Sequence, residues 1–234
     1  MRQQLRSLKL VSASDTNRKP GRPKGGKSKQ TRERILDAAE QLFADRGYDG
    51  ASIRDVAAAA GLQIHSISYH FGPKEQLFDA VVARRADIMT GLRGEALETS
   101  RQQAGAAAIP IKQLVRDYAS PFIQSASHGD VGWRNYAALM GWLANSPLGT
   151  EIIARHYDDM AREYITELQR ALAGAEPEDV VEGFSAMVAA MLGICAATGR
   201  PERLAGRSAQ RPPEESFEAL VRFHTAGFLA LTVA

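Results

Sequence analysis

Residues 52–78 constrain the fold of this chain more than any other segment, because they form a pattern of two short helices, a glycine turn and the start of a third helix. Ser52 lies three residues before Asp55, the approximate spacing of a capping box that opens a helix. Gly61 can adopt the left-handed conformation that a sharp turn requires. The pattern predicts a helix-turn-helix, whose second helix can enter the major groove of DNA. An ordinary helical hairpin with a polar surface is the alternative.

The second helix of this pattern divides its residues between two faces. Ile64, Ile67 and Phe71 recur at spacings of three and four, which predicts an apolar side. The polar side chains between them offer hydrogen bonds to phosphates and base edges. The predicted DNA-contacting residues in and around the motif are Lys29, Thr31, Ser52, Gln63, Ile64, His65, Ser66, Ser68, Tyr69, His70 and Lys74.

Two neighbouring features favour DNA binding over a plain helical hairpin. Residues 30–48 have the pattern of an amphipathic helix, which supplies the third helix that such a domain needs for a core. Residues 1–35 hold 11 Lys or Arg and 2 Asp or Glu, a net charge of +9, whereas the whole chain has a net charge of only +2. Basic charge concentrated beside the motif indicates a polyanionic partner.

The first 28 residues are polar and rich in Ser, Gly and Pro, so we expect a disordered basic arm. Within it, the Gly-Arg-Pro core around Arg22, flanked by basic residues such as Arg18, resembles an AT-hook. In such a motif an arginine fits the narrow minor groove of A·T-rich DNA. A solvated basic tail that binds phosphates without preference is the alternative.

The segments SIRDVAAAAGL and SYHFGPKEQLF, together with the preceding helix, resemble the N-terminal domain of the tetracycline-repressor (TetR) family of transcription regulators over residues 30–80. Two positions differ, because the family often has glycine in place of His65 and tyrosine in place of Ser68. The resemblance implies a C-terminal domain that encloses an effector pocket. It also implies a dimer whose interface is made by the last two helices, which suits a palindromic operator.

The rest of the chain reads as all-α. Strand signals are nearly absent, and helices are expected at about 74–98, 110–126, 131–145, 149–173, 177–197 and 214–233. A long polar loop is expected at 199–213. We therefore predict a three-helix DNA-binding domain at 29–75, joined by a long helix to a ligand-binding and dimerisation domain at 76–234.

Composition limits the cellular location. The chain has no run of eighteen apolar residues, which predicts no membrane span. The basic N-terminus has no apolar region after it and so does not read as a secretory signal. The single Cys195 cannot form an intrachain disulfide, which is typical of a reducing cytoplasm. We expect a cytoplasmic protein.

The last two expected helices are apolar around most of their circumference, so each must bury more than one face. One face can pack inside the subunit and another against a second copy of the chain. A central position of both helices in a monomer is the alternative. The predicted homodimer contacts are Phe184, Val188, Phe217, Leu220 and Phe228.

The middle helices are rich in aromatic and methionine residues. Aromatic walls with a few hydroxyls suit a small hydrophobic or aromatic effector, and methionines adapt to varied shapes. We expect a cavity of about 300 Å³ or more here, with plain core packing as the alternative for each residue. The predicted ligand-binding residues are Met89, Tyr118, Phe122, Trp133, Tyr136, Met140, Tyr157, Met160, Met187 and Met191.

No catalytic motif is recognisable, so we expect neither an enzyme nor a cofactor. His156, Asp159 and Glu163 share one helical face, but a solvated polar face explains them better than a metal site. The hypothesis is a ligand-responsive dimeric repressor that binds a double-stranded DNA operator. The alternative is an architectural protein that holds A·T-rich DNA and senses no ligand.

Overall fold

The computed structural model describes residues 24–196, 198–209 and 211–232, and no strand occurs among them. The prediction of an all-α chain is confirmed. The helices are α1 (Lys24–Gly50), α2 (Ile53–Ala59), α3 (Ile64–Phe71), α4 (Lys74–Ala104), α5 (Ile111–His128), α6 (Val131–Leu143), α7 (Pro147–Ala171), α8 (Pro177–Cys195), α9 (Arg200–Leu204) and α10 (Pro213–Ala230).

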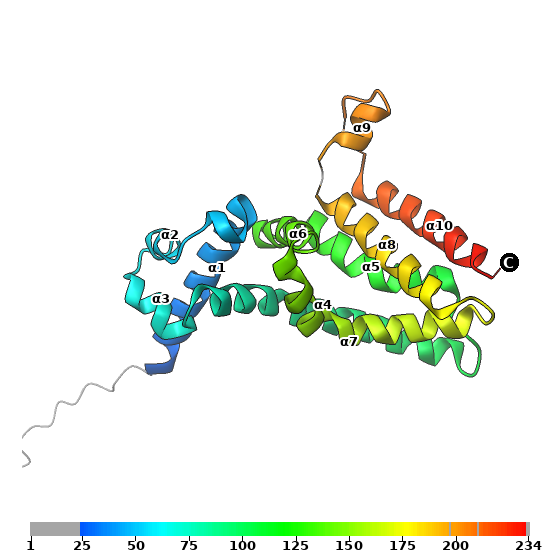
Figure 1. The fold of residues 1–234 in the computed structure, drawn as a ribbon, viewed down its shortest axis with the longest axis horizontal. Helices are drawn as coiled ribbons and strands as arrows, with labels where there is room; N and C mark the ends of the chain where they lie inside the picture. The colour runs from blue at the N-terminus through cyan, green and yellow to red at the C-terminus, as the bar shows by residue number, and fades with distance from the viewer. Residues whose placement is uncertain (1–23, 197, 210, 233–234) are drawn as a thin grey trace, which may run out of the picture.

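The three N-terminal helices lie at one end of an elongated molecule, and α4 runs from them along the larger helical bundle (Figure 1). Pro73 caps the start of α4, so this helix begins directly after the helix-turn-helix. At 1.5 Å per residue its 31 residues span about 46 Å. Helix α4 packs against α5 and α7, and α1 packs against both α4 and α6. The N-terminal helices are therefore anchored to the bundle at two places.

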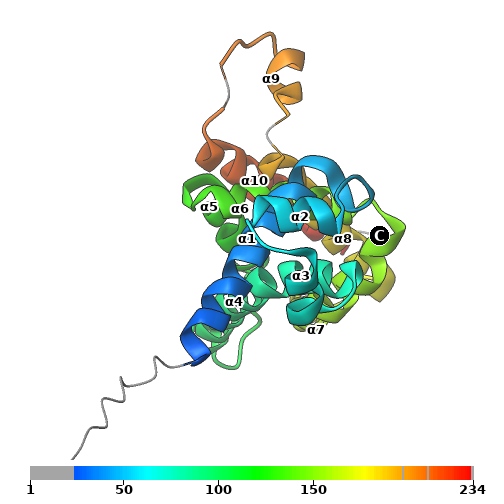
Figure 2. The ribbon, with the colours of Figure 1, turned by 90° about the vertical axis from the view of Figure 1, so that its left-hand side faces the viewer.

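The larger bundle consists of α5 to α8 and α10. Helix α10 packs against α5 and α8, and α8 also contacts α5, α6 and α7. Asp130 and Ser146 cap the starts of α6 and α7 with their side chains. The short helix α9 stands away from the rest of the bundle in both views (Figures 1 and 2).

The largest differences from the predicted helices lie at the start of α1, at the end of α4 and in the expected loop at 199–213. Helix α1 begins at Lys24, so residues 24–28 belong to it, although they were expected in the disordered arm. The sequence KGGKS at these positions has no apolar periodicity, which is why the pattern missed them. Helix α4 continues to Ala104, and α9 lies inside the expected loop, where Pro201 occupies its first turn. Residues 1–23 lie outside the described residues.

Among the residues described, no helix combines the length and the apolar character needed to cross a bilayer.

Candidate nucleic-acid interface and helical core

The cap at the start of α2 and the turn between α2 and α3 are built as the sequence predicts. Ser52 Oγ accepts a hydrogen bond from the Asp55 N–H at 3.1 Å, and the Ser52 N–H donates to Asp55 Oδ2 at 2.9 Å. The hydrogen bonds from Ser52 favour the carboxylate and lower the pKa of Asp55. Gly61 has a φ of +62°, the left-handed conformation that the turn requires. Arg34 of α1 donates to the carbonyl of Ala60 and so ties this turn to α1.

Helix α3 presents its polar face to solvent. Ile67 and Phe71 are buried with 0% and 6% of their surface exposed, so they fix the helix to the domain. Tyr69 is 84% exposed, and Ile64 is 46% exposed although the spacing placed it on the apolar side. Figure 2 shows α1, α2 and α3 at the end of the molecule that faces the viewer. Of the predicted DNA-contacting residues on or before α3, the exposed ones are Gln63, Ile64, His65, Ser68 and Tyr69, and the half-buried ones are Ser66 and His70.

The predicted DNA contacts outside α3 differ in whether their side chains are free or already engaged within the protein. Lys29 is exposed on the first turns of α1, whereas the Thr31 hydroxyl is bonded to the Lys27 carbonyl of its own helix. The Lys74 ammonium lies 4.2 Å from the centre of the Tyr48 ring. Ser52 is exposed but its hydroxyl is engaged in the cap of α2. Arg18 and Arg22 lie outside the described residues.

Sequence reasoning missed Arg32, which joins α1 to the end of α3. Its Nη1 donates to the His70 carbonyl at 3.3 Å, and its guanidinium lies 4.2 Å from the centre of the Phe71 ring. The exposed cation therefore sits against the C-terminal end of α3. Its position three residues after Lys29, on the same side of α1, was the available signal.

An ionic cluster fixes α1 to α4. Glu40 of α1 is 2% exposed, and its carboxylate accepts from Arg85 Nε at 2.5 Å and also from Arg84. Arg84 donates in addition to Asp37 at 2.7 Å. Burial opposes the charge of Arg84, but the hydrogen bond with Asp37 and the charge of Glu40 outweigh it and raise its pKa. The Arg85 guanidinium lies 4.7 Å from the centre of the Trp133 ring, which extends the cluster to α6.

An aromatic cluster strengthens the same junction. The Phe78 ring of α4 makes edge contacts with Phe43, Tyr48 and Trp142, at centroid distances of 4.9, 5.0 and 6.2 Å. Gly47 has a φ of +68°, and a Cβ there would lie 3.3 Å from Trp142 Nε1. Helices α1, α4 and α6 thus form one packed junction between the N-terminal helices and the bundle.

The predicted ligand-binding residues lie mainly in the core of the bundle. Tyr136 and Tyr157 join their hydroxyls in a hydrogen bond, and Tyr118 packs edge-on against Tyr164 at 5.1 Å. Burial raises the pKa of both bonded hydroxyls, that of Tyr157 to about 12, so both stay protonated at neutral pH. The buried members are Met89, Tyr118, Phe122, Tyr136, Met140, Tyr157, Met187 and Met191, and the half-buried ones are Trp133 and Met160.

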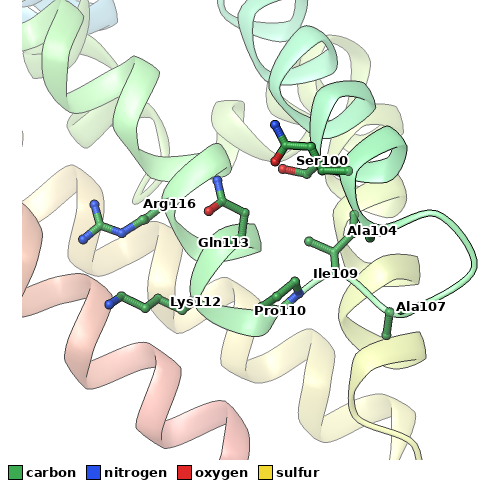
Figure 3. A pocket seen from close by; sticks show the side chains of 10 residues that line it. Ser100, Ala104, Ala107, Ile109, Pro110, Lys112, Gln113 and Arg116 are labelled. Carbon is green, nitrogen blue, oxygen red and sulfur yellow. The ribbon is translucent and has the colours of Figure 1, made fainter.

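The largest pocket described lies elsewhere. It has a volume of about 640 Å³, is open to solvent, and forms where the end of α4, the loop 105–110 and the start of α5 meet (Figure 3). Its lining includes Lys112, Gln113 and Arg116, and Arg116 is paired with Glu218 of α10 at 2.5 Å. None of the predicted ligand-binding residues borders it or the two smaller pockets described. The expected cavity is not among these pockets, because the aromatic side chains pack against one another.

Sequence reasoning also missed Arg93, which lies in the core of the helical bundle with 2% of its surface exposed. Its Nε donates to the Tyr118 carbonyl at 2.9 Å, and its Nη2 lies 3.6 Å from the Met191 Sδ. The Tyr164 hydroxyl donates to the Arg93 carbonyl at 2.9 Å. The available signal was a lone arginine four residues after Met89 and four before Leu97, within the buried stripe of α4.

Three of the five predicted dimer contacts face the inside of the protomer. Phe184, Leu220 and Phe228 are buried inside the protomer with 5%, 5% and 2% of their surface exposed. Phe228 packs so closely on α8 that a Cβ at Gly183 would lie 2.9 Å from its ring. Val188 and Phe217 are half-buried against the same core. The sequence could not tell the inner face of these helices from the outer one, because both are apolar.

The outer face of the last two long helices carries the residues that remain exposed. Phe223 and Leu229 of α10 are 74% and 52% exposed, and Val181 of α8 is 42% exposed. A Cβ at Gly193 or Gly227 would meet nothing within 4 Å, so the backbone is open there. The exposed apolar and small residues of this outer face are Val181, Ala186, Ala190, Gly193, Phe223, Ala226, Gly227 and Leu229.

The three residues considered for a metal site have separate partners. His156 Nε2 lies 3.0 Å from Asp79 Oδ1, Asp159 pairs with Arg162 at 2.8 Å, and Glu163 pairs with Arg101 at 3.0 Å. No group of three metal-binding side chains occurs in the part of the chain that the structure describes.

Two protein-family models match this chain. Residues 35–81 match the model of bacterial regulatory proteins of the tetR family, and residues 116–227 match the tetracyclin repressor-like C-terminal domain. The first match covers the helix-turn-helix and the second covers most of the bundle.

Characterised relatives match only part of this chain. The transcriptional repressor AcnR of Corynebacterium glutamicum is 39% identical over 70 residues, which cover 28% of this chain and 37% of AcnR. The transcriptional activator FasR of Mycolicibacterium smegmatis is 30% identical over 121 residues, covering 48% of this chain and 51% of FasR. The match with AcnR thus spans 37% of that relative's length and the match with FasR 51%.

A solved structure extends the likeness to the whole fold. The crystal structure of AibR in complex with isovaleryl coenzyme A and operator DNA superposes with a TM-score of 0.55 and 20% sequence identity. The superposition covers 82% of this chain and 97% of that chain. At this identity the likeness establishes a shared fold.

Proposed function

We propose that this chain, which belongs to the tetR family of bacterial regulatory proteins, is a homodimeric transcriptional repressor released from its operator by a small hydrophobic or aromatic effector. The observation that carries the proposal is the exposed polar face of α3, whose C-terminal end is bound by Arg32 of α1. In this proposal residues 29–75 bind DNA, residues 76–234 bind the effector and the second copy, and the protein acts in the cytoplasm.

DNA reading is assigned to α3. Its exposed residues include a phenol at Tyr69, an imidazole at His65 and an amide at Gln63, which can donate to and accept from base edges. Lys29 and Arg32 at the start of α1 are placed to contact phosphates, which orient the domain without reading sequence. The buried pair Ile67 and Phe71 keeps α3 from rotating on the domain.

Effector release is assigned to α4, because both functional regions depend on its position. Only Gly72 and Pro73 separate the end of α3 at Phe71 from the start of α4 at Lys74, so movement of α4 moves α3. Its first half is fixed to α1 by Glu40 and by the Phe78 cluster. An effector that binds the bundle better when α4 is displaced would shift the population away from the DNA-binding arrangement.

Dimerisation is assigned to the outer face of α8 and α10 defined above. Phe223 and Leu229 supply exposed apolar area, and Gly193 and Gly227 allow a second pair of helices to approach closely. Two-fold symmetry makes the same patch meet itself and sets two α3 helices at two half-sites, about 34–36 Å apart on DNA.

The experiment is selection of operators from a randomised duplex library, followed by affinity measurements. Alanine at His65, Ser66 or Tyr69 should change the selected base preference and weaken operator binding by about 1–3 kcal/mol per lost base contact. Arg162→Gln, on the exposed surface of α7, is the matched control and should leave the preference unchanged.

If none of the three substitutions in α3 alters the selected sequence, the assignment of α3 as the reading helix is wrong. Binding that tolerates any A·T-rich duplex and falls steeply with salt would instead indicate an architectural protein.

A further inference from the structure

Arg93 presents an unbalanced charge in the core. With 2% of its surface exposed, the guanidinium is cut off from water, and within the described residues no carboxylate oxygen lies within 4 Å of it. A buried ion without a counter-ion is costly, because its lost hydration must be replaced by partners inside the protein. Buried arginines are therefore normally paired.

The partners that Arg93 does have are weak or partial. One nitrogen donates to a backbone carbonyl, that of Tyr118, at 2.9 Å. Another faces the Met191 thioether at 3.6 Å, and a thioether is a weak acceptor. The ring of Tyr118 lies 3.7 Å from the guanidinium carbon, which adds a cation–π contact. None of these groups carries the negative charge that the guanidinium lacks.

The buried carboxylate of Asp117, on the helix that also carries Tyr118, does not supply that charge. Asp117 is 8% exposed and is held by Ser100 at 2.6 Å and by Gln113 at 2.7 Å. It makes no ion pair with Arg93, and burial raises its pKa. In contrast, Arg84 and Arg85 of α4 share the buried carboxylate of Glu40. Along α4, Arg93 therefore differs from Arg84 and Arg85 in having no carboxylate partner among the described residues.

The surroundings of Arg93 suit a ligand with one charged end. The Tyr157 ring lies 5.9 Å from the guanidinium carbon, and its hydroxyl, bonded to that of Tyr136, stays protonated and can donate. Met191 is unbranched and flexible, so its side chain can leave the position that it occupies against the guanidinium. Phe184 and Met187 extend the apolar wall on α8.

We propose that Arg93 is the receptor for the carboxylate of an amphipathic effector, whose apolar body replaces Met191 in the core. A carboxylate can accept two parallel hydrogen bonds from the guanidinium fork, which the thioether cannot. The proposal rests on the function proposed above and adds the chemical class of the effector, an apolar monocarboxylate. Because Arg93 belongs to α4, the new pair would also act on the helix that carries α3.

The test compares carboxylates with their neutral amides on the intact protein bound to its selected operator. The probes are decanoate with decanamide, and 4-phenylbutyrate with 4-phenylbutanamide. Binding is followed by calorimetry, and release by fluorescence anisotropy of the labelled operator. At least one carboxylate should bind about 30-fold or more tightly than its amide and release the operator, since a desolvated charge pair distinguishes the two.

Two variants separate charge from shape. Arg93→Met should lose the preference for the carboxylate and yet stay folded, because it removes an unbalanced buried charge and leaves an apolar side chain. Arg93→Lys should retain part of the preference, since it keeps the charge without the fork. Arg162→Gln is the matched control and should behave as the wild type.

Equal binding of acid and amide, or an unchanged preference in Arg93→Met, would overturn the role of Arg93. If the amides release the operator as well as the acids do, effector control stands while this proposal fails. If no probe binds, the proposal fails for apolar monocarboxylates, and operator selection still tests the DNA-binding function independently. The comparison of acid and amide on the wild-type protein needs no variant, so it tests the proposal even if Arg93→Met misfolds.

Discussion

Replacing Glu40 with glutamine tests how the DNA-binding helices are fixed to α4. The substitution keeps the shape of the side chain and removes the anion between Arg84 and Arg85. Glu40 is 2% exposed, whereas the side chains of the two arginines are 19% and 11% exposed. Breaking a buried ion pair by changing one partner costs about 3–5 kcal/mol. Arg84 keeps Asp37 at 2.7 Å and both arginines reach some water, so we expect a loss at or below the lower end of this range, roughly 2–3 kcal/mol in the free energy of unfolding.

Urea denaturation followed by circular dichroism measures this loss. Wild type and variants are compared at one protomer concentration, because association of folded chains raises apparent stability. Asp159→Asn is the matched control, because it removes the carboxylate of an exposed pair with Arg162 and should change nothing measurable. A Glu40→Gln midpoint equal to that of this control would refute the reasoning that the cluster holds α1 to α4.

Two further predictions concern α2 and the outer helical face. Ser52→Ala should lower stability at neutral pH by about 1 kcal/mol through loss of the cap of α2. Because the pKa of Asp55 is lowered in the folded state, the part of the stability that depends on its charge is present above the ordinary Asp pKa of about 4 and is lost as the pH falls through the lowered value. Thermal unfolding should therefore show the difference between wild type and Ser52→Ala shrinking in acid, and a difference independent of pH would contradict the role of Asp55. Phe223→Glu should separate dimers into protomers in light scattering, whereas Leu204→Glu, an equally exposed site on α9, should not. A monomeric wild type at micromolar concentration would rule out the proposed interface.

Local signals in the sequence were sufficient for the helix-turn-helix. The cap at Ser52, the turn at Gly61 and the buried pair Ile67 and Phe71 each depend on residues within a few positions of one another. Such features obey rules of helix capping and periodicity that a single sequence reveals.

Features that depend on distant segments were not predictable. The inner face of α8 is chosen by packing with Tyr118, which lies 4.8 Å from Phe184 between ring centres. Nothing in the apolar pattern of α8 separates that face from the one that carries Val181. Glu40 and Arg93 each interrupt an apolar stripe, but only the fold reveals that the first meets two arginines and the second meets no carboxylate.

In the proposed function, the contrast between these charges lets one helix serve two purposes. Arg84 and Arg93 are separated by nine residues, about 14 Å along α4. At Arg84 the charges are balanced by groups of the protein itself, so the junction with α1 is complete without a ligand. At Arg93 the balance is missing, and a group that supplies it would gain binding energy where the protein has left a deficit. A rigid connection requires the first arrangement and a responsive site requires the second. In this proposal, transmission from effector to DNA needs no movement within the junction at Arg84, only displacement of the helix that contains both residues.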